Sequence, residues 1–247
     1  MNRTPAPALP RRLLAELLGT ALLVAVVVGS GIAAQALSPD DVGLQLLENS
    51  TATVLGLSVL ILLFGPVSGA HFNPVVSLAD WFIGRRAVSG LRLAEVGAYV
   101  AAQVVGAVGG AVLANAMFGV PTALSTKDRA TGPHLLAEVV ATSVLVALVF
   151  ALARTGRGAI AAPAVGAYIG AAYWFTSSTS FANPAVTIGR IFSDTFAGIA
   201  ATSAPAFVAA QLAGLVLGVA ITLALYPDAA SRADDVVVPH PSRPTPA

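Results

Sequence analysis

The 247-residue sequence contains no cysteine, and only 10% of its residues are charged. Without cysteine the chain can form no disulfide framework, no thiolate metal site and no cysteine nucleophile. Three histidines, at positions 71, 134 and 240, are too few and too scattered for a histidine metal site. No nucleophile–base pair stands out. We therefore expect neither an enzyme nor a bound cofactor or metal.

The low charge content also decides the environment of the chain. A soluble domain carries about 25% charged residues, whereas this sequence is 56% hydrophobic. The net charge of +1 offers no basic stripe for phosphates, so we expect a lipid bilayer, and no nucleic acid, around the protein. Six apolar segments are candidates to span that bilayer, at about 11–37, 49–64, 91–118, 133–152, 160–175 and 204–226. The first follows basic residues, as in a signal peptide, but its length and the lack of a convincing cleavage site favour a retained helix.

Two Asn-Pro pairs, Asn73-Pro74 and Asn183-Pro184, predict helices that start abruptly inside apolar sequence. Asn is a strong N-cap, and Pro at the first helical position loses no hydrogen bond. The helix-compatible stretches that follow, 74–84 and 184–192, are about ten residues long. At 1.5 Å per residue each rises ~15 Å, which is half of a ~30 Å hydrocarbon layer.

The chain contains an internal repeat. Residues 13–24 and 135–146 are identical at seven of twelve positions, and 99–103 resembles 207–211, each followed by two glycines four residues apart. The Asn-Pro segments fall between these matches in the same order. Each half, about 11–118 and 133–226, holds three spans, so the halves have opposite orientations in the membrane. We therefore predict an all-α membrane protein of six transmembrane helices plus two half-membrane re-entrant helices in an inverted repeat.

Charge placement predicts the orientation of this single domain, 11–226. With a cytoplasmic N-terminus, ten arginines fall inside and only Lys127, Arg129 and Arg190 fall outside. This bias fits the positive-inside rule. We expect a plasma or inner membrane protein with both termini in the cytoplasm, where residues 1–10 and 227–247 form flexible tails.

Inversion brings the two Asn-Pro starts together near the midplane. Irregular backbone at that depth is tolerated only beside protein or a water-filled cavity. We expect the carbonyls of Gly69, Ala70 and His71 to line one wall of a polar path, with the Asn73 and Asn183 amides at its centre. Two helix N-termini facing one point would repel cations and protons there.

The sequence resembles the major intrinsic proteins, the aquaporin and aquaglyceroporin channels. The motifs that carry the resemblance are Ser-Gly-Ala-His-Phe-Asn-Pro at 68–74, the second Asn-Pro, and the Ala-Glu pairs that open spans one and four. The resemblance covers about 11–226. It implies a homotetramer in which each subunit has its own pore. It also implies passive flow of water or small neutral solutes without cofactor or energy source.

This sequence departs from the usual family pattern at the selectivity filter. In the family an arginine usually follows the second Asn-Pro-Ala, but here Val186 stands in that place, and the first motif reads Asn-Pro-Val. Arg190 is four residues further on and on a similar helix face, so it either reaches the pore or lies at the outer surface. Counting from the motifs assigns the other filter positions to Thr53, Ser180 and Tyr173, with Ala171 or Trp174 as alternatives for the last. An arginine-free filter with small side chains favours larger neutral solutes: glycerol, urea or undissociated metalloid acids such as arsenite.

Glu16 and Glu138 lie in apolar spans, where a carboxylate is costly and by default functional. Two interpretations are open. The resemblance implies that each accepts hydrogen bonds from the non-helical backbone before an Asn-Pro helix, and the symmetry of the halves favours this brace. Alternatively, they are the proton-coupling groups of a secondary transporter.

Overall fold

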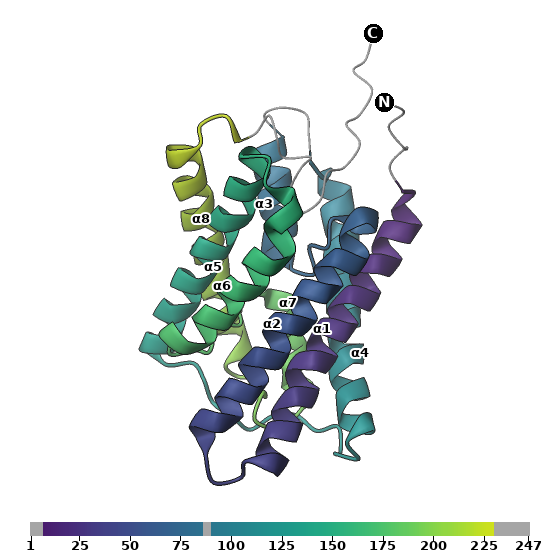
Figure 1. The fold of residues 1–247 in the computed structure, drawn as a ribbon, viewed down its shortest axis with the longest axis vertical. Coiled ribbons are helices and arrows are strands. Elements are labelled where there is room, and N and C mark those ends of the chain that lie inside the picture. Colours follow the sequence, from purple (N-terminus) through teal and green to yellow (C-terminus); the bar gives the residue numbers. More distant parts are fainter. Residues whose placement is uncertain (1–6, 86–89, 230–247) are drawn as a thin grey trace.

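The computed structural model describes residues 7–85 and 90–229, and within these ranges every regular element is helical. Six helices are long and apolar enough to cross a membrane. They are α1 (Leu9–Leu37), α2 (Val42–Ser68), α4 (Leu93–Met117), α5 (Gly132–Arg154), α6 (Ala161–Phe175, preceded by the short η1, Gly158–Ile160) and α8 (Ala204–Leu225). They form one elongated bundle (Figure 1). The predicted all-α membrane fold is confirmed.

Helix α2 is longer than the predicted span 49–64. It begins at Val42, where the Asp41 side chain accepts a hydrogen bond from the Leu44 peptide N–H at 2.9 Å. It then continues through Pro66 and ends at Gly69, whose φ of 90° is left-handed. A proline near the end of a long helix removes a single hydrogen bond, so α2 continues past the predicted end at residue 64. The non-helical stretch before Asn73 therefore starts at Gly69.

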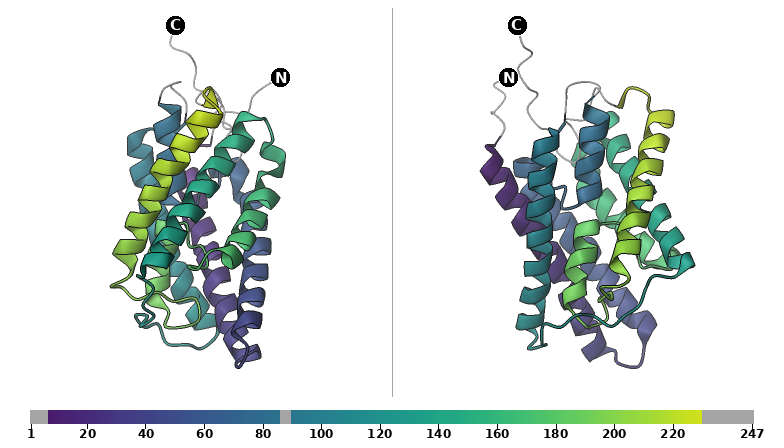
Figure 2. Two further views of the ribbon diagram at one scale, coloured as in Figure 1. Left: turned by 90° about the vertical axis from the view of Figure 1, so that its left-hand side faces the viewer. Right: turned by 180° about the vertical axis from the view of Figure 1, so that it is seen from behind.

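The two half-length helices start where the sequence predicted. Helix α3 spans Pro74–Gly84, and α7 spans Pro184–Gly189 before tightening into the 3-10 turn η2 (Arg190–Phe192). They occupy opposite halves of the bundle: α3 lies toward the end where α1 begins and α8 ends, and α7 lies toward the other end (Figures 1 and 2). Each half-helix thus fills about half the depth of the bundle.

Helix pairs α1–α4 and α5–α8 pack closely in the two halves because glycines face the partner backbone. A Cβ on Gly106 of α4 would lie 2.3 Å from the Leu17 carbonyl oxygen of α1. A Cβ on Gly218 of α8 would lie 2.6 Å from the Ser143 carbonyl oxygen of α5. Small residues at these positions let the two backbones approach closely.

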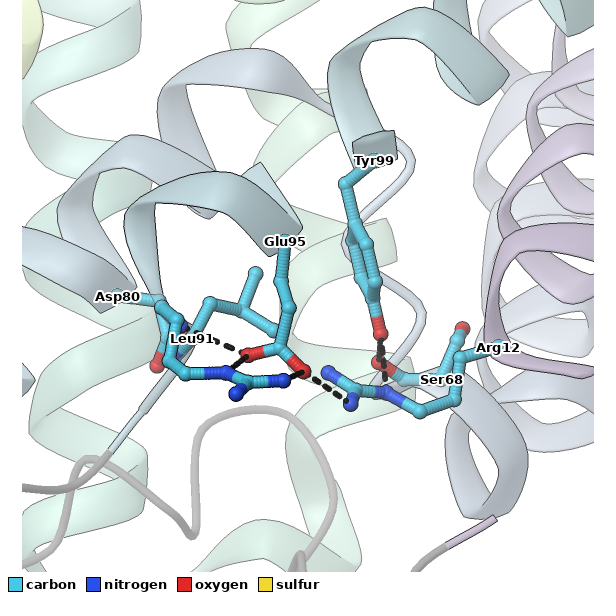
Figure 3. Close-up of polar contacts among 7 residues, drawn as sticks. Arg12, Ser68, Asp80, Leu91, Glu95 and Tyr99 are labelled. Atoms are coloured by element: carbon cyan, nitrogen blue, oxygen red, sulfur yellow. Dashed lines mark hydrogen bonds and ion pairs between the residues drawn. The ribbon is translucent and has the colours of Figure 1, made fainter. Parts of the chain in front are cut away.

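A polar network ties three helices together at the end where α1 begins (Figure 3). Arg12 of α1 donates to the Tyr99 hydroxyl at 2.9 Å and to the Glu95 carboxylate at 3.1 Å, both on α4. Tyr99 in turn donates to the Ser68 carbonyl at the end of α2, at 2.9 Å. This fixes the point where the chain leaves α2 for the first non-helical stretch. Of the predicted tails, residues 1–6 and 230–247 lie outside the described residues.

Candidate functional site

The starts of α3 and α7 are joined directly to each other. The Asn73 side chain donates from Nδ2 to the Ala182 carbonyl, and the Asn183 side chain donates from Nδ2 to the Phe72 carbonyl, both at 2.8 Å. Each side-chain oxygen caps its own helix, at 3.0 Å from the peptide nitrogen of Val75 or Ala185. Since an amide nitrogen carries two hydrogens, one N–H of each asparagine is left for another acceptor.

The backbone before each asparagine adopts the same unusual conformation. Left-handed φ angles occur at Gly69, Ala70 and Phe72, and again at Thr179, Ser180 and Ala182. When Asn73 is aligned with Asn183, these two sets fall on the same three positions. A non-glycine residue in this region costs on the order of 1–3 kcal/mol. The surrounding structure must therefore hold both stretches in place.

Glu16 and Glu138, both fully buried, hold these stretches. Each carboxylate accepts four hydrogen bonds of 2.6–3.0 Å. The donors to Glu16 are the Ser68 hydroxyl, the peptide N–H groups of His71 and Phe72, and the Gln103 amide. The donors to Glu138 are the Ser178 hydroxyl, the peptide N–H groups of Phe181 and Ala182, and the Gln211 amide. Each carboxylate therefore joins its own span to the backbone before one half-helix through four hydrogen bonds.

A narrow cavity of about 70 Å³ passes the junction of the two half-helices. Its apolar wall comes from four spans: Leu23, Val27, Leu57, Ile61, Leu145, Val149, Val165 and Ile169. Its polar lining is Thr53, His71, Asn73, Tyr173, Ser180, Asn183 and Arg190. Ala70 also lines it, whereas Gly69 ends α2 and is not part of the lining. The aliphatic wall was not identified from the sequence, because apolar residues in a span carry no sign of which face they occupy.

Of the three α6 residues considered for the filter, Tyr173 is the one that lines this cavity. It is buried, and its hydroxyl lies 3.2 Å from the Thr53 hydroxyl of α2. Thr53 donates its own proton to the Asn49 carbonyl at 2.8 Å, so Tyr173 donates to Thr53 and keeps an oxygen lone pair for the cavity. Of the alternatives, Ala171 is exposed and Trp174 is 53% exposed on the outside of the bundle.

Val186 and Ser180 also line the cavity. Both are buried, and Val186 is the third residue of α7, where its peptide N–H donates to the Asn183 side chain at 3.2 Å. The Ser180 hydroxyl is buried with no hydrogen-bond partner among the residues that the structure describes. The four positions assigned by counting, Thr53, Tyr173, Ser180 and Val186, thus all line this one cavity.

Arg190 reaches the cavity, which settles the question that the sequence left open. Its side chain is only 2% exposed and lines the cavity with Val186. Its Nε donates to the Ala197 carbonyl, and its guanidinium carbon lies 3.4 Å from the centre of the Phe181 ring. An outer-surface position is therefore wrong. The spacing of four residues, one helical turn, was the available signal.

The fold is that of a membrane pore built from an inverted repeat. It has six spans, two half-length helices joined start to start, and a narrow cavity along that junction. Residues 4–180 match the family model described as Major intrinsic protein. The chain therefore belongs to the major intrinsic protein family. It is a passive transmembrane channel, and not an enzyme.

Sequence relatives agree with this membership. The chain is 50% identical over 214 residues to aquaglyceroporin AqpS of Rhizobium meliloti (strain 1021), covering 86% of this chain and 89% of the relative. It is 33% identical over 178 residues to the glycerol uptake facilitator protein of Pseudomonas aeruginosa, covering 62% of this chain and 61% of that protein. The fold is similar to the X-ray structure of the aquaglyceroporin from Plasmodium falciparum, with a TM-score of 0.63 at 18% identity over 90% of this chain and 96% of that one.

Proposed function

We propose that water and small neutral solutes cross the membrane through this cavity by facilitated diffusion, while ions and protons are excluded. The observation that carries the proposal is the meeting of the α3 and α7 starts at the cavity. Each helix start carries about half a positive charge, and the lining residues include no carboxylate to offset it. A cation is repelled there, whereas a neutral solute accepts a hydrogen bond from the second N–H of Asn73 or Asn183.

The selectivity filter in this proposal is formed by Thr53, Tyr173, Ser180 and Val186. Val186 contributes an apolar surface, and the others contribute hydroxyl groups. Along the rest of the path, the backbone carbonyls at Ala70 and His71 accept hydrogen bonds from the solute. The aliphatic side chains of the cavity wall contact the carbon skeleton of the solute. Such a two-sided path suits solutes that are partly apolar and carry several hydrogen-bonding groups.

Glycerol, urea and undissociated metalloid acids such as arsenite have this character, and we propose them as solutes together with water. Two relatives, which are named an aquaglyceroporin and a glycerol uptake facilitator, support these solutes for this channel. The brace geometry of Glu16 and Glu138 argues against the alternative, a proton-coupled transporter, because their oxygens are already occupied by donors.

Stopped-flow swelling of proteoliposomes with water, glycerol, urea and arsenite tests the function. Non-saturating flux that is insensitive to an uncoupler is the expected result. Saturable flux that collapses with the uncoupler would support the transporter instead, and the absence of any flux above that of empty liposomes would refute the channel.

Assembly and orientation are part of the proposal. We expect a homotetramer with one pore per subunit, as membership of the family implies. Residues 11–226 form one channel domain of two repeats, with both tails in the cytoplasm of a plasma or inner membrane. Native mass spectrometry tests the assembly. Because the chain lacks cysteine, Asp40→Cys provides a unique label site, and an impermeant maleimide should reach it only from outside.

A further inference from the structure

A second cavity lies on the outside of the bundle, between α3 and α8. It is a groove of about 350 Å³, within the range of about 300–1,000 Å³ that small-molecule sites occupy. Leu78, Trp81 and Phe82 of α3 line it together with five aliphatic residues of α8 between Leu215 and Leu223. The two helices lie side by side in the same half of the bundle (Figure 2). Because every lining residue is apolar, the groove suits a hydrocarbon chain.

The groove opens toward the lipid and not toward the pore. On α8, Val216 is 70% exposed, and Ala220, one turn further along, is exposed as well. In the described part of the chain the groove and the pore cavity share no lining residue. The outer face of a membrane-spanning helix is surrounded by acyl chains. An occupant of the groove therefore comes from the bilayer.

The length of the groove matches one leaflet. Leu215 and Leu223 are eight residues apart on α8, which corresponds to ~12 Å at a rise of 1.5 Å per residue. One leaflet contributes ~15 Å, half of the ~30 Å hydrocarbon core. Helix α8 ends at Leu225, so the groove runs from the end of the span toward the midplane. An acyl chain that fills it leaves its headgroup at the ends of α3 and α8.

A cation stands at this end of the groove. Arg85 directly follows α3, and its guanidinium carbon lies 4.2 Å from the ring centre of Phe82 and 5.3 Å from that of Trp81. Both rings belong to the groove lining. The Arg85 side chain is exposed, and the ion pairs within 7–85 and 90–229 involve other residues. Since the rings are uncharged, the charge and the N–H donors of Arg85 remain available to an anion.

We propose that this groove binds an anionic phospholipid, with one acyl chain between α3 and α8 and the headgroup phosphate against Arg85. The guanidinium fork matches the oxygens of a phosphate group. In the proposed orientation this end faces the cytoplasm, where the leaflet surface is negative. The lipid packs against the half-helix that starts at Asn73. The inference goes beyond solute passage, because lipid binding requires no flux.

Native mass spectrometry in a neutral detergent tests the site. Dioleoylphosphatidylglycerol, which is anionic, and dioleoylphosphatidylcholine, which is zwitterionic with the same chains, are titrated separately. Each wild-type subunit should retain one phosphatidylglycerol, with an affinity about fivefold above that for phosphatidylcholine, and Arg85→Gln should abolish this preference. Fivefold is about 1 kcal/mol, the contribution of one basic residue near an anionic surface.

Ala220→Phe tests the groove independently of the charge. The added ring occupies the space of the acyl chain, so the affinity for both lipids should fall at least about fivefold. Two matched controls should bind both lipids as wild type does. Arg157→Gln removes an exposed cation at the same end of the bundle, and Val105→Phe adds the same ring at a 62% exposed position on α4. Water flux in proteoliposomes confirms that each variant is folded.

Unchanged phosphatidylglycerol binding in either Arg85→Gln or Ala220→Phe would overturn the inference. A changed oligomeric state of Ala220→Phe in the same spectra would also overturn it, because the groove would then be a contact between copies of the chain. A wild-type protein that prefers phosphatidylglycerol but passes no solute would support the lipid site and refute the proposed function.

Discussion

Glu16 and Glu138 occupy equivalent positions in the two halves and accept hydrogen bonds from equivalent groups. Each receives two peptide N–H groups, one serine hydroxyl and one glutamine amide. The peptide groups belong to the stretches with left-handed φ angles. Each carboxylate therefore holds a strained backbone segment in the shape that presents an asparagine to the pore.

Replacing either carboxylate by an amide should destabilise the fold. In Glu138→Gln one side-chain oxygen becomes an NH2 group that faces donors, leaving buried donors without an acceptor at a cost of about 1–3 kcal/mol each. Glu16→Gln should behave alike. Thermal unfolding in detergent measures both, with Asp40→Asn in an exposed turn as the control. A Glu138→Gln protein as stable as the control would show that the brace is dispensable.

Gly106 should not tolerate even a methyl group. In Gly106→Ala the new Cβ would lie 2.3 Å from the Leu17 carbonyl oxygen, so α1 and α4 must separate, at a cost of about 1–3 kcal/mol. Gly109 on the same helix meets nothing within 4 Å, and Gly109→Ala should be neutral or stabilising by up to about 1 kcal/mol. Unfolding temperatures of the two variants, compared side by side, test the prediction; equal values would contradict it.

Val186→Arg should narrow the filter and add a second charge near Arg190. Glycerol and urea flux should fall at least tenfold, equivalent to about 1.4 kcal/mol of added barrier, whereas water flux should fall less because water is smaller. Paired swelling assays with water and glycerol measure the ratio, with Val186→Ala as a control that keeps the site uncharged. Equal loss of both fluxes would refute the filter assignment.

The hydrogen bond between Ser203 and the Asp128 carboxylate should be weakened only at acidic pH. The Ser203 hydroxyl donates to the Asp128 carboxylate at 2.5 Å and lowers the pKa of that carboxyl below its usual range. A carboxyl with a lowered folded pKa stabilises the protein above its unfolded pKa of about 3.9, and this stabilisation is lost as the pH falls through the folded pKa. Between pH 7 and 5 the contribution should therefore be constant.

Unfolding temperatures in detergent from pH 7 to pH 3, for wild type and Asp128→Asn, measure this effect. The difference between the two proteins should be constant down to about pH 5 and should shrink below about pH 4. A difference that does not depend on pH over the whole interval would show that the contact does not depend on the charge of Asp128.

Much of the fold could be read from local patterns. The Asn-Pro pairs located both half-helices because capping and the fixed φ of proline act within a few residues. The end of α2 was predicted too early, at residue 64, because near a helix end the favourable contacts of the whole helix outweigh the one hydrogen bond lost at Pro66. Counting from the motifs picked out Thr53, Tyr173, Ser180 and Val186, all of which line the cavity. It could not choose among Ala171, Tyr173 and Trp174, since that choice depends on the rotation of α6 against α2.

The sequence alone determined the membrane environment, the duplication and the two asparagines at the starts of the half-helices, because composition, repeats and helix starts are properties of the chain itself. The tertiary structure decided where Arg190 points. A helical spacing places a side chain on a face, but only the Ala197 carbonyl and the Phe181 ring, which other parts of the fold bring alongside, hold this guanidinium in the pore. Burial of a charge is settled by partners distant in sequence or on another element, and these exist only once the chain has folded.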